Sequence, residues 1–305
     1  MTATTFFRAL LVVWCFTACI YALNVSSAKE LISIFKNTPE KAVNVDIEVL
    51  NDLDFSGITL TRPLGLSESG NKCFEYSGAI HGNGHTIKNI EMTNTTYPHS
   101  GLFCALKDVT VENLFIDSSC SFTGLNVGAL TVSVFGSLHV KNVTTQAAVS
   151  GFERVGGFVG FIDGLRQEHT TVSFDDCTSG GIFNGNGRGI GGFFGTIGNN
   201  TNLDITISSC TSEGEMTGLS RFGGFIGHIT NNTNLMLSFS NNTNRLPISK
   251  GACIGGFVGL IDNNIEINMT LTYCSNQENI TGTREAGGLI GTVKGNTKMI
   301  FIHSH

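Results

Sequence analysis

Charged residues are scarce in this 305-residue chain, and their scarcity excludes several kinds of partner. Only 14% of the residues are charged, against about 25% in a typical soluble domain. The net charge of −6 is mild, and the sequence contains no basic runs, which argues against nucleic acid as a partner. We therefore expect a surface built mainly from Ser, Thr, Asn and Gly residues.

The sequence also lacks the short motifs that mark common enzymes and metal sites. It contains no H-E-x-x-H, no G-x-S-x-G and no phosphate-binding loop. Seven cysteines follow residue 22, and no two of them have C-x-x-C spacing. We accordingly expect no enzyme activity, no metal and no cofactor.

Long apolar runs are absent beyond the first 22 residues. Arg8 precedes a mostly apolar stretch, Ala9–Ile20, that is too short to span a bilayer. This pattern predicts a signal peptide over residues 1–22, cleaved after Ala22, and a protein that is secreted or held at the cell surface. An uncleaved anchor is the alternative interpretation of the same residues.

What the sequence does contain is a repeat. The block Gly-Gly-Phe-apolar-Gly recurs in steps of 35, 32, 32 and 32 residues, with Leu replacing Phe in the last copy. The blocks begin at Gly156, Gly191, Gly223, Gly255 and Gly287. A fixed period of this length indicates a solenoid, in which each unit buries its apolar face against the next.

Each period contains three short apolar stretches separated by Gly, Asn, Ser and Thr. One stretch alternates apolar and polar residues, as in Leu203–Ile207 and Ile267–Leu271, which is typical of a strand with one buried face. No segment of ten residues has helical spacing, so an α-solenoid does not fit. We predict an all-β fold, a parallel β-helix of roughly 28–35-residue coils.

Stacked coils should place equivalent residues in columns. The phenylalanines of the Gly blocks, Phe158, Phe193, Phe225 and Phe257, should form an interior ladder at a spacing of ~4.8 Å. The glycine pairs should allow the backbone to turn tightly, or to take positive φ, beside that ladder.

Weaker copies of the Gly block lie upstream, at Ser100–Cys104 and Gly128–Val132, and residues 79–90 contain Gly-Asn-Gly-His. Together these motifs resemble the GLUG-motif repeat family over roughly residues 75–295. The resemblance implies a β-helix-like fold and a role in adhesion or surface display, and it brings no catalytic residues. The many Phe, Asn and Cys residues depart from the family pattern.

The residues before this region should cap it. Residues 23–74 are expected to contain a short capping helix, Ala28–Lys36, with Ser27 as its N-cap and Pro39 beyond its end. The strand Val45–Val49 should follow. Residues 75–305 then form one continuous β-helix repeat domain.

Eight Asn-x-Ser/Thr sequons follow residue 22, although chance alone would give about five or six in such a composition. They are candidate N-glycosylation sites at Asn24, Asn94, Asn142, Asn199, Asn231, Asn241, Asn268 and Asn279. Asn199 and Asn231 stand out because each lies in an Asn-Asn-Thr-Asn cluster at the same corner of successive coils.

The cysteines admit two interpretations. An exported chain can form disulfides, but Cys is also a small apolar residue that fills stacked columns, and we favour the second. Cys177 and Cys210 occupy one column, and we expect both to be unpaired, poorly reactive thiols. The remaining cysteines of the mature chain are Cys73, Cys104, Cys120, Cys253 and Cys274.

Parallel β-helices also house polysaccharide lyases and hydrolases, so a carbohydrate-active enzyme is the alternative function. Asp175 and Asp176 are the only adjacent carboxylates in the repeats, and a solvated turn explains them better than catalysis. His81 and His85 flank the Gly-Asn-Gly turn, but no third metal ligand is apparent.

Basic residues precede several Gly blocks, namely Arg188, Arg221, Lys250 and Arg284. Such a row could bind an acidic glycan or an acidic protein on another cell or matrix, although simple solubility explains it more readily. We therefore expect an adhesive, binding or structural role without catalysis.

The last segment, Met299–His303, matches Ile267–Leu271 but stops before the third strand of its coil. We expect either that the natural protein continues beyond His305 or that two molecules associate end to end through this coil.

Overall fold

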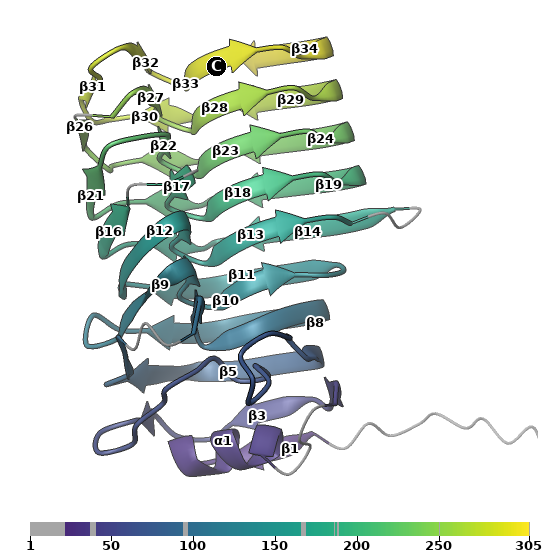
Figure 1. The fold of residues 1–305 in the computed structure, drawn as a ribbon, viewed down its shortest axis with the longest axis vertical. Coiled ribbons are helices and arrows are strands. Elements are labelled where there is room, and N and C mark those ends of the chain that lie inside the picture. Colours follow the sequence, from purple (N-terminus) through teal and green to yellow (C-terminus); the bar gives the residue numbers. More distant parts are fainter. Residues whose placement is uncertain are drawn as a thin grey trace, which may run out of the picture.

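The computed structural model describes residues 22–36, 41–93, 97–165, 169–185, 187, 189–249 and 251–304. Apart from Ala22, the predicted signal peptide lies outside these residues. The chain forms a parallel β-solenoid of about eight turns in which 62% of the described residues are in strands and 3% are helical. The coils stack along one axis (Figure 1), and the all-β prediction is confirmed.

In the part of the chain that the structure describes, the larger of two sheets has 22 strands. Eight strands form a long face: β5 (Glu75–Lys88), β8 (Phe103–Ile116), β11 (Leu138–Thr145), β14 (Thr170–Asp175), β19 (Thr201–Ser208), β24 (Thr233–Ser240), β29 (Ile265–Thr272) and β34 (Thr297–Ser304). A second column comprises β10 (Thr131–Val134), β13 (Val159–Asp163), β18 (Phe194–Gly198), β23 (Ile226–Thr230), β28 (Val258–Asp262) and β33 (Ile290–Lys294). The short strands are β15 (Thr178–Ser179), β20 (Thr211–Ser212), β25 (Thr243–Asn244) and β30 (Ser275–Asn276), with β1 (Leu23–Val25), β2 (Val43–Asn44), β3 (Ile47–Val49) and β4 (Leu53–Asp54) at the N-terminal end.

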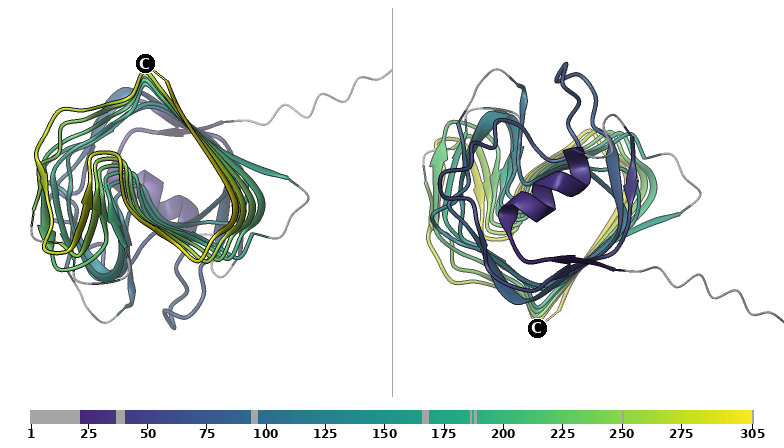
Figure 2. Two further views of the ribbon diagram at one scale, coloured as in Figure 1. Left: turned by 90° about the horizontal axis from the view of Figure 1, so that it is seen from above. Right: turned by 90° about the horizontal axis from the view of Figure 1, so that it is seen from below.

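The smaller sheet has 12 strands. It begins with β6 (Glu91–Met92), β7 (His99–Ser100), β9 (Ser121–Gly128) and β12 (Ala148–Gly156). It continues as two columns, one with β16 (Ile182–Gly185), β21 (Glu215–Gly218), β26 (Ile248–Ser249) and β31 (Ile280–Thr281), the other with β17 (Gly189–Gly191), β22 (Phe222–Gly223), β27 (Cys253–Gly255) and β32 (Glu285–Gly287). Seen along the axis, the outline folds inward on one side (Figure 2).

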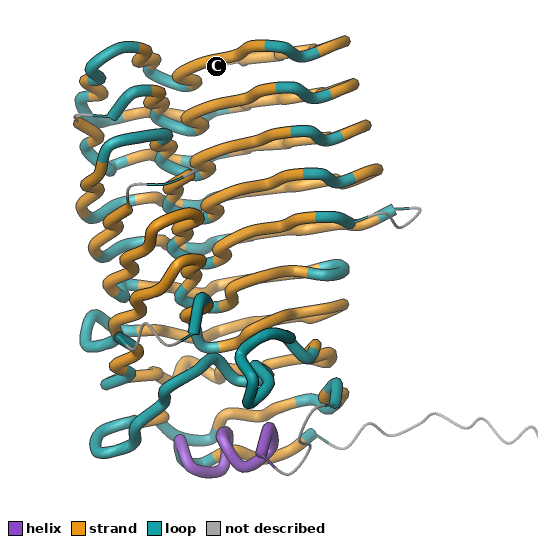
Figure 3. Tube along the Cα trace, in the orientation of Figure 1, coloured by secondary structure: helices purple, strands orange, loops and turns teal. Residues whose placement is uncertain are grey.

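A regular coil contains five strands, as in β18–β22, where the sequence indicated three apolar stretches. The difference arises because corners divide those stretches. The Gly block separates β22 from β23, and a corner at Asn241, in the left-handed conformation (φ 54°), separates β24 from β25. Strands and corners alternate in the same order in the successive C-terminal coils (Figure 3).

Strand pairing confirms the alignment of the repeats. Phe194 pairs with Ile226, which pairs with Val258. The weaker upstream copies follow the same register, since Thr131 pairs with Phe103 on one side and Val159 on the other. The sequence period therefore equals one turn of the solenoid even where the motif is degenerate.

The predicted phenylalanine ladder forms the centre of the core. Phe158, Phe193, Phe225 and Phe257 are all fully buried. The centroids of successive rings lie 5.0, 4.9 and 4.8 Å apart in near-parallel stacks. Phe239 meets the ladder edge-on, 5.8 Å from Phe225. This spacing follows from the distance between paired strands and confirms the prediction.

Glycines of the block are needed for close backbone approach. A Cβ on Gly191 would lie 2.2 Å from the carbonyl oxygen of Phe194, and one on Gly224 would lie 2.1 Å from that of Gly256. Neither glycine has positive φ. The tight turn that we expected is present at these two positions, whereas the alternative of positive φ does not apply to them.

A buried ladder of asparagines, not expected from the sequence, runs along a corner of the last four coils. Asn200 donates to Asn232 at 2.9 Å, Asn232 to Asn264 at 2.9 Å, and Asn264 to Asn296 at 2.8 Å. Each of the first three is at most 1% exposed. Because these amides also bond to neighbouring backbone groups, the ladder satisfies polar groups at the turn.

Helix α1 (Ala28–Lys36) has the predicted bounds and lies across the N-terminal opening of the solenoid (Figure 2). The backbone N–H of Glu30 donates to Ser27 Oγ at 3.4 Å, as an N-cap requires. Phe35 packs against Tyr76 and Phe103 of the first coils. Pro39 lies outside the described residues. The predicted strand 45–49 is shorter, because β3 begins at Ile47.

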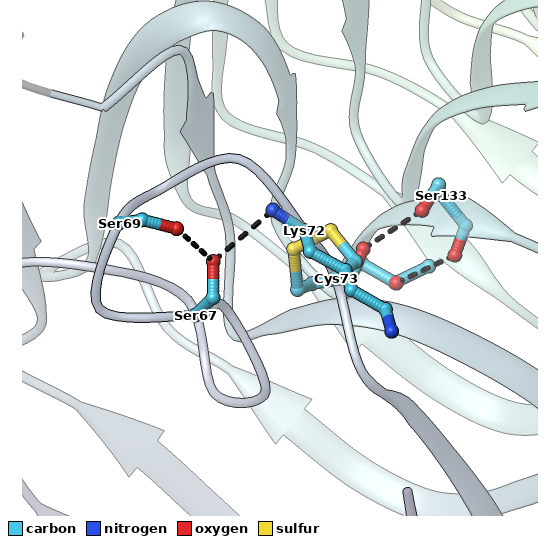
Figure 4. The surroundings of a disulfide bond; sticks show 7 residues. Ser67, Ser69, Lys72, Cys73 and Ser133 are labelled. Atoms are coloured by element: carbon cyan, nitrogen blue, oxygen red, sulfur yellow. Dashed lines mark hydrogen bonds between the residues drawn. A yellow bond between two sulfur atoms is a disulfide. The ribbon is translucent and has the colours of Figure 1, made fainter. Parts of the chain in front are cut away.

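The preference for unpaired cysteines is wrong for one pair. Cys73 and Cys104 form a disulfide, which joins the segment before β5 to β8 (Figure 4). Cys177 and Cys210 are free and buried, as expected. They point inward because residues 176 and 209 take positive φ at the corner, which reverses the strand alternation.

Candidate functional site

The outward side of the long face contains two columns of hydroxyl side chains in its C-terminal half. Their members pair in register from coil to coil, and all are partly or fully exposed. We call this surface the hydroxyl face; it comprises Ser173, Thr206, Ser238 and Thr270 in one column and Ser208, Ser240, Thr272 and Ser304 in the other. Residues of alternate parity face the core, as Leu235 and Phe239 do.

Toward the N-terminal end of the solenoid, the column that contains Ser208 continues with ionisable side chains. Glu48, His81, Glu112, Lys141 and Asp175 follow one another in register. His81 Nδ1 lies 2.7 Å from Glu112 Oε1, and its Nε2 lies 3.9 Å from Glu48. Carboxylates therefore occupy every second position of this column, with His81 and Lys141 between them, and the column changes from ionisable to hydroxyl side chains at Ser208.

The candidate metal and catalytic residues occupy this face without converging. His85 Nδ1 lies 3.5 Å from Asp52, while His81 pairs with a different carboxylate. Asp175 accepts a hydrogen bond from Ser208 Oγ at 2.6 Å, whereas Asp176 is exposed at the next corner with φ of 53°. Among the described residues, no three His, Cys, Asp or Glu side chains gather in a way that could hold a metal ion.

The sequon asparagines within the described residues all reach solvent. Asn268 is half-buried on the long face, and the other six are exposed: Asn24, Asn142, Asn199, Asn231, Asn241 and Asn279. Asn94 lies outside the described residues. Asn199 donates to Asp163 at 2.8 Å. Their positions leave each described sequon accessible, and glycosylation itself stays a prediction.

A second polar region, the polar seam, lies where the inward fold brings the smaller sheet against the β13–β33 column. Arg154 Nη2 donates to Asp163 at 3.1 Å, and its guanidinium covers the ring of Phe161 at 4.6 Å. Farther along the seam, Glu285 accepts from Thr292 Oγ1 at 2.6 Å and from Cys253 Sγ at 3.2 Å. Each of these pairs joins the two sides of the fold or two adjacent coils.

His228 is the most buried ionisable group of the polar seam. Its Nε2 lies 2.9 Å from Asp262 Oδ1, and its Nδ1 lies 3.4 Å from Arg221 Nη1. Because Arg221 can only donate, His228 must accept at Nδ1 and donate from Nε2 as a neutral ring. Burial lowers the pKa of His228, against the opposing effect of Asp262.

Asp262 is ionised beside this neutral ring. Burial would raise the pKa of Asp262, but hydrogen bonds from Thr230 and His228 outweigh it, and the pKa is lowered. The two shifts agree with one arrangement, a cationic Arg221, a neutral His228 and an anionic Asp262. The arrangement is charge-balanced and almost closed to solvent, so it stabilises the seam and leaves little room for a substrate.

The structure describes two of the four residues of the predicted basic row. Arg188 and Lys250 lie outside the described residues. Arg284 is exposed, whereas Arg221 is half-buried and directed toward His228. Arg221 therefore contributes to the polar seam and does not form a free outer edge for an acidic ligand.

Sequence reasoning missed the hydroxyl face and the polar seam. A signal for the first exists, because Thr206-Ile207-Ser208 and Thr270-Leu271-Thr272 are 64 residues apart and share the Ser/Thr-x-Ser/Thr pattern. The polar seam gives no such signal, because the residue type changes from coil to coil in its column. The column consists of Arg154, Gly189, Arg221, Cys253 and Glu285.

Comparisons with known proteins give one resemblance in sequence and one in fold. No family model matches the chain. A stretch of 90 residues is 37% identical to halomucin from Haloquadratum walsbyi, and it covers 29% of this chain but 1% of that protein. A crystal structure of a candidate immunoglobulin A1 protease from Bacteroides ovatus superposes with a TM-score of 0.59 at 16% identity.

This second match covers 93% of the chain and 83% of the Bacteroides protein, so it establishes a shared β-solenoid fold. At 16% identity it says nothing of activity. No helix within the described residues has the length and apolar character to cross a bilayer. The chain therefore has the architecture of a known type of β-solenoid and matches a very small part of a far longer protein.

Proposed function

We propose that this protein is exported and displayed outside the cell, where its solenoid surface binds a glycan or protein of another cell or matrix. The observation that carries the proposal is the hydroxyl face, an exposed and in-register array on a rigid stack of coils. Such a surface offers many equivalent hydrogen-bonding groups to an extended partner. The stretch similar to halomucin, the accessible sequons and the resemblance to GLUG-motif repeats support an extracellular role.

A catalytic role has less support. The Asp175 and Asp176 carboxylates do not face each other across a site, and His228 is enclosed. A carbohydrate-active enzyme needs two positioned carboxylates that a substrate can reach. Purified protein that cleaves a polysaccharide would establish this alternative in place of the binding role.

Localisation and binding can be tested together. An epitope-tagged chain should label intact, non-permeabilised cells or appear in the medium, and treatment with an N-glycosidase should reduce its mass. The same purified protein should bind a member of a panel of immobilised glycans and matrix proteins. A tag found only inside the cell, together with no binding in the panel, would refute the proposal.

A further inference from the structure

The N-terminal cap borders a cavity that is open to solvent on one side and plays no part in the binding surface proposed above. It has a volume of about 620 Å³ and lies between α1 and the segment 60–68. Phe74 and the residues that lead into β2 complete its lining. This volume is within the range of about 300–1,000 Å³ found for small-molecule sites.

The cavity is lined mainly by apolar side chains. The helix contributes Ile32 and Phe35, and the segment opposite contributes Leu60, Leu64 and Leu66. Four of these five are buried, with Phe35 half-buried. A ligand that fills this space must therefore present an apolar body, since unsatisfied polar groups would lose hydrogen bonds to water.

The polar residues of the lining are mostly cationic and lie toward solvent. Lys36 and Lys41 are exposed, and the Arg62 side chain is 31% exposed. One carboxylate accompanies them, because Glu68 lies 3.6 Å from Arg62, and its side chain is 86% exposed. Such an exposed pair contributes little stability, so another anion could replace Glu68 beside Arg62 at little cost.

The wall opposite the helix is held in place before any ligand binds. Leu66 and Cys73 form an antiparallel bridge, and Leu64 forms a parallel bridge with Phe103 of β8. The disulfide between Cys73 and Cys104 fixes the same segment to β8, and Ser67 Oγ accepts from the backbone of Lys72 at 3.1 Å (Figure 4). A preformed site avoids much of the ordering cost of binding.

We propose that this cavity binds a free single-chain anionic amphiphile, such as a fatty acid. The alkyl chain occupies the space between α1 and the leucines of the opposite segment. The carboxylate lies at the exposed rim, where Arg62 offers a bidentate pair of donors and the two lysines add positive charge. Three cations against one carboxylate favour an anion over a neutral or cationic head group.

Calorimetric titration of the mature chain with decanoate, dodecanoate and tetradecanoate, each below its aggregation concentration, tests the proposal. Because a buried methylene contributes ~0.8 kcal/mol, affinity should rise about fourfold for each added carbon. Dodecanol, which has the same chain without the charge, should bind at least tenfold more weakly than dodecanoate. Equal affinity for dodecanol and dodecanoate would overturn the proposal.

Variants at the rim give effects of opposite sign. Arg62→Gln should weaken dodecanoate binding about tenfold, and Glu68→Gln should strengthen it severalfold by releasing Arg62. Lys141→Gln, on the outer face of β11, is the matched charge control and should change nothing. Binding that is insensitive to both rim variants, or no binding at all, would contradict the inference.

Variants that fill the cavity with a larger side chain distinguish binding in this cavity from binding at other surfaces. Leu66→Trp should abolish binding while the thermal midpoint shows that the chain stays folded, and Leu60→Trp provides a second such variant. The protein should not co-sediment with vesicles of anionic phospholipid on centrifugation. Binding to vesicles without binding to dodecanoate would show that a membrane surface, and not a free amphiphile, is the ligand.

Discussion

Truncation of Phe225 to alanine tests the stacked core at its centre. Phe225 is fully buried, and its ring lies 4.9 Å from that of Phe193 and 4.8 Å from that of Phe257. Removal of a buried Phe side chain costs about 3–5 kcal/mol, a loss that includes aromatic pairs of about 0.5–1.5 kcal/mol each. We expect a loss near the upper end of the first range, because two stacked neighbours lose contacts at once.

Phe225→Leu is the matched control. Leu289 occupies this column in the last coil and Leu130 in an earlier one, so the turn accommodates leucine. The control should cost about 1.5 kcal/mol. Urea denaturation gives the free energies, and hydrogen exchange should show the loss concentrated in the coils of β18–β28, since repeats couple mainly to their neighbours. Equal effects of Ala and Leu, or a loss spread evenly over all coils, would refute the reasoning.

Three further changes probe the turn, the amide ladder and the seam. Gly224→Ala should destabilise by about 2 kcal/mol or more, because its Cβ would lie 2.1 Å from a carbonyl oxygen, whereas Gly288→Ala meets nothing within 4 Å and should be nearly neutral in thermal unfolding. Asn232→Ala removes the Oδ1 that accepts from both the side-chain amide and the backbone N–H of buried Asn200, so it should cost about 1–3 kcal/mol in urea denaturation, and a neutral result would show that the ladder is dispensable. The pKa of His228 is lowered in the folded protein, whereas in the unfolded chain it has the ordinary value of about 6.5. Just below pH 6.5 the unfolded chain therefore binds more protons than the folded protein. The contribution of His228 to the free energy of unfolding should be complete above pH 6.5 and should be lost as the pH decreases through the folded pKa. His228→Gln should flatten this part of the pH profile, and an unchanged slope would contradict the neutral assignment.

The sequence predicts the repeat and its core because both depend on local patterns. The period, the phenylalanine ladder and the bounds of α1 follow from apolar alternation and a helix cap, and the structure confirms them. The five-strand coil could not be foreseen, because it depends on which polar residues take positive φ, and Asn, Ser and Tyr all do so at one corner, as at Asn241, Ser209 and Tyr273.

The candidate sites were harder to predict, because they depend on contacts between adjacent coils and on the inward fold within one coil. The disulfide joins Cys73 and Cys104 across adjacent coils, and neither cysteine has a spacing that identifies its partner. Arg221 was expected at an exposed edge, but the inward fold of the coil turns it toward His228. Stacking of coils therefore decides the cysteine pairing, and the fold within one coil decides the pairing of Arg221.

Lysine variants of the hydroxyl face show whether this surface binds the partner. Replacement of Thr206, Ser238 and Thr270 by lysine places three like charges in one column without touching the core, and far-UV circular dichroism checks the fold. Lysine at Gln146, Thr217 and Gln277, which are exposed outside this face and belong to no sequon, is the control for added charge. We expect the face variant to lose at least tenfold in affinity for the glycan or matrix protein that the unmodified chain binds, while the control retains that affinity. Equal binding by both variants would contradict the claim that this face carries the function.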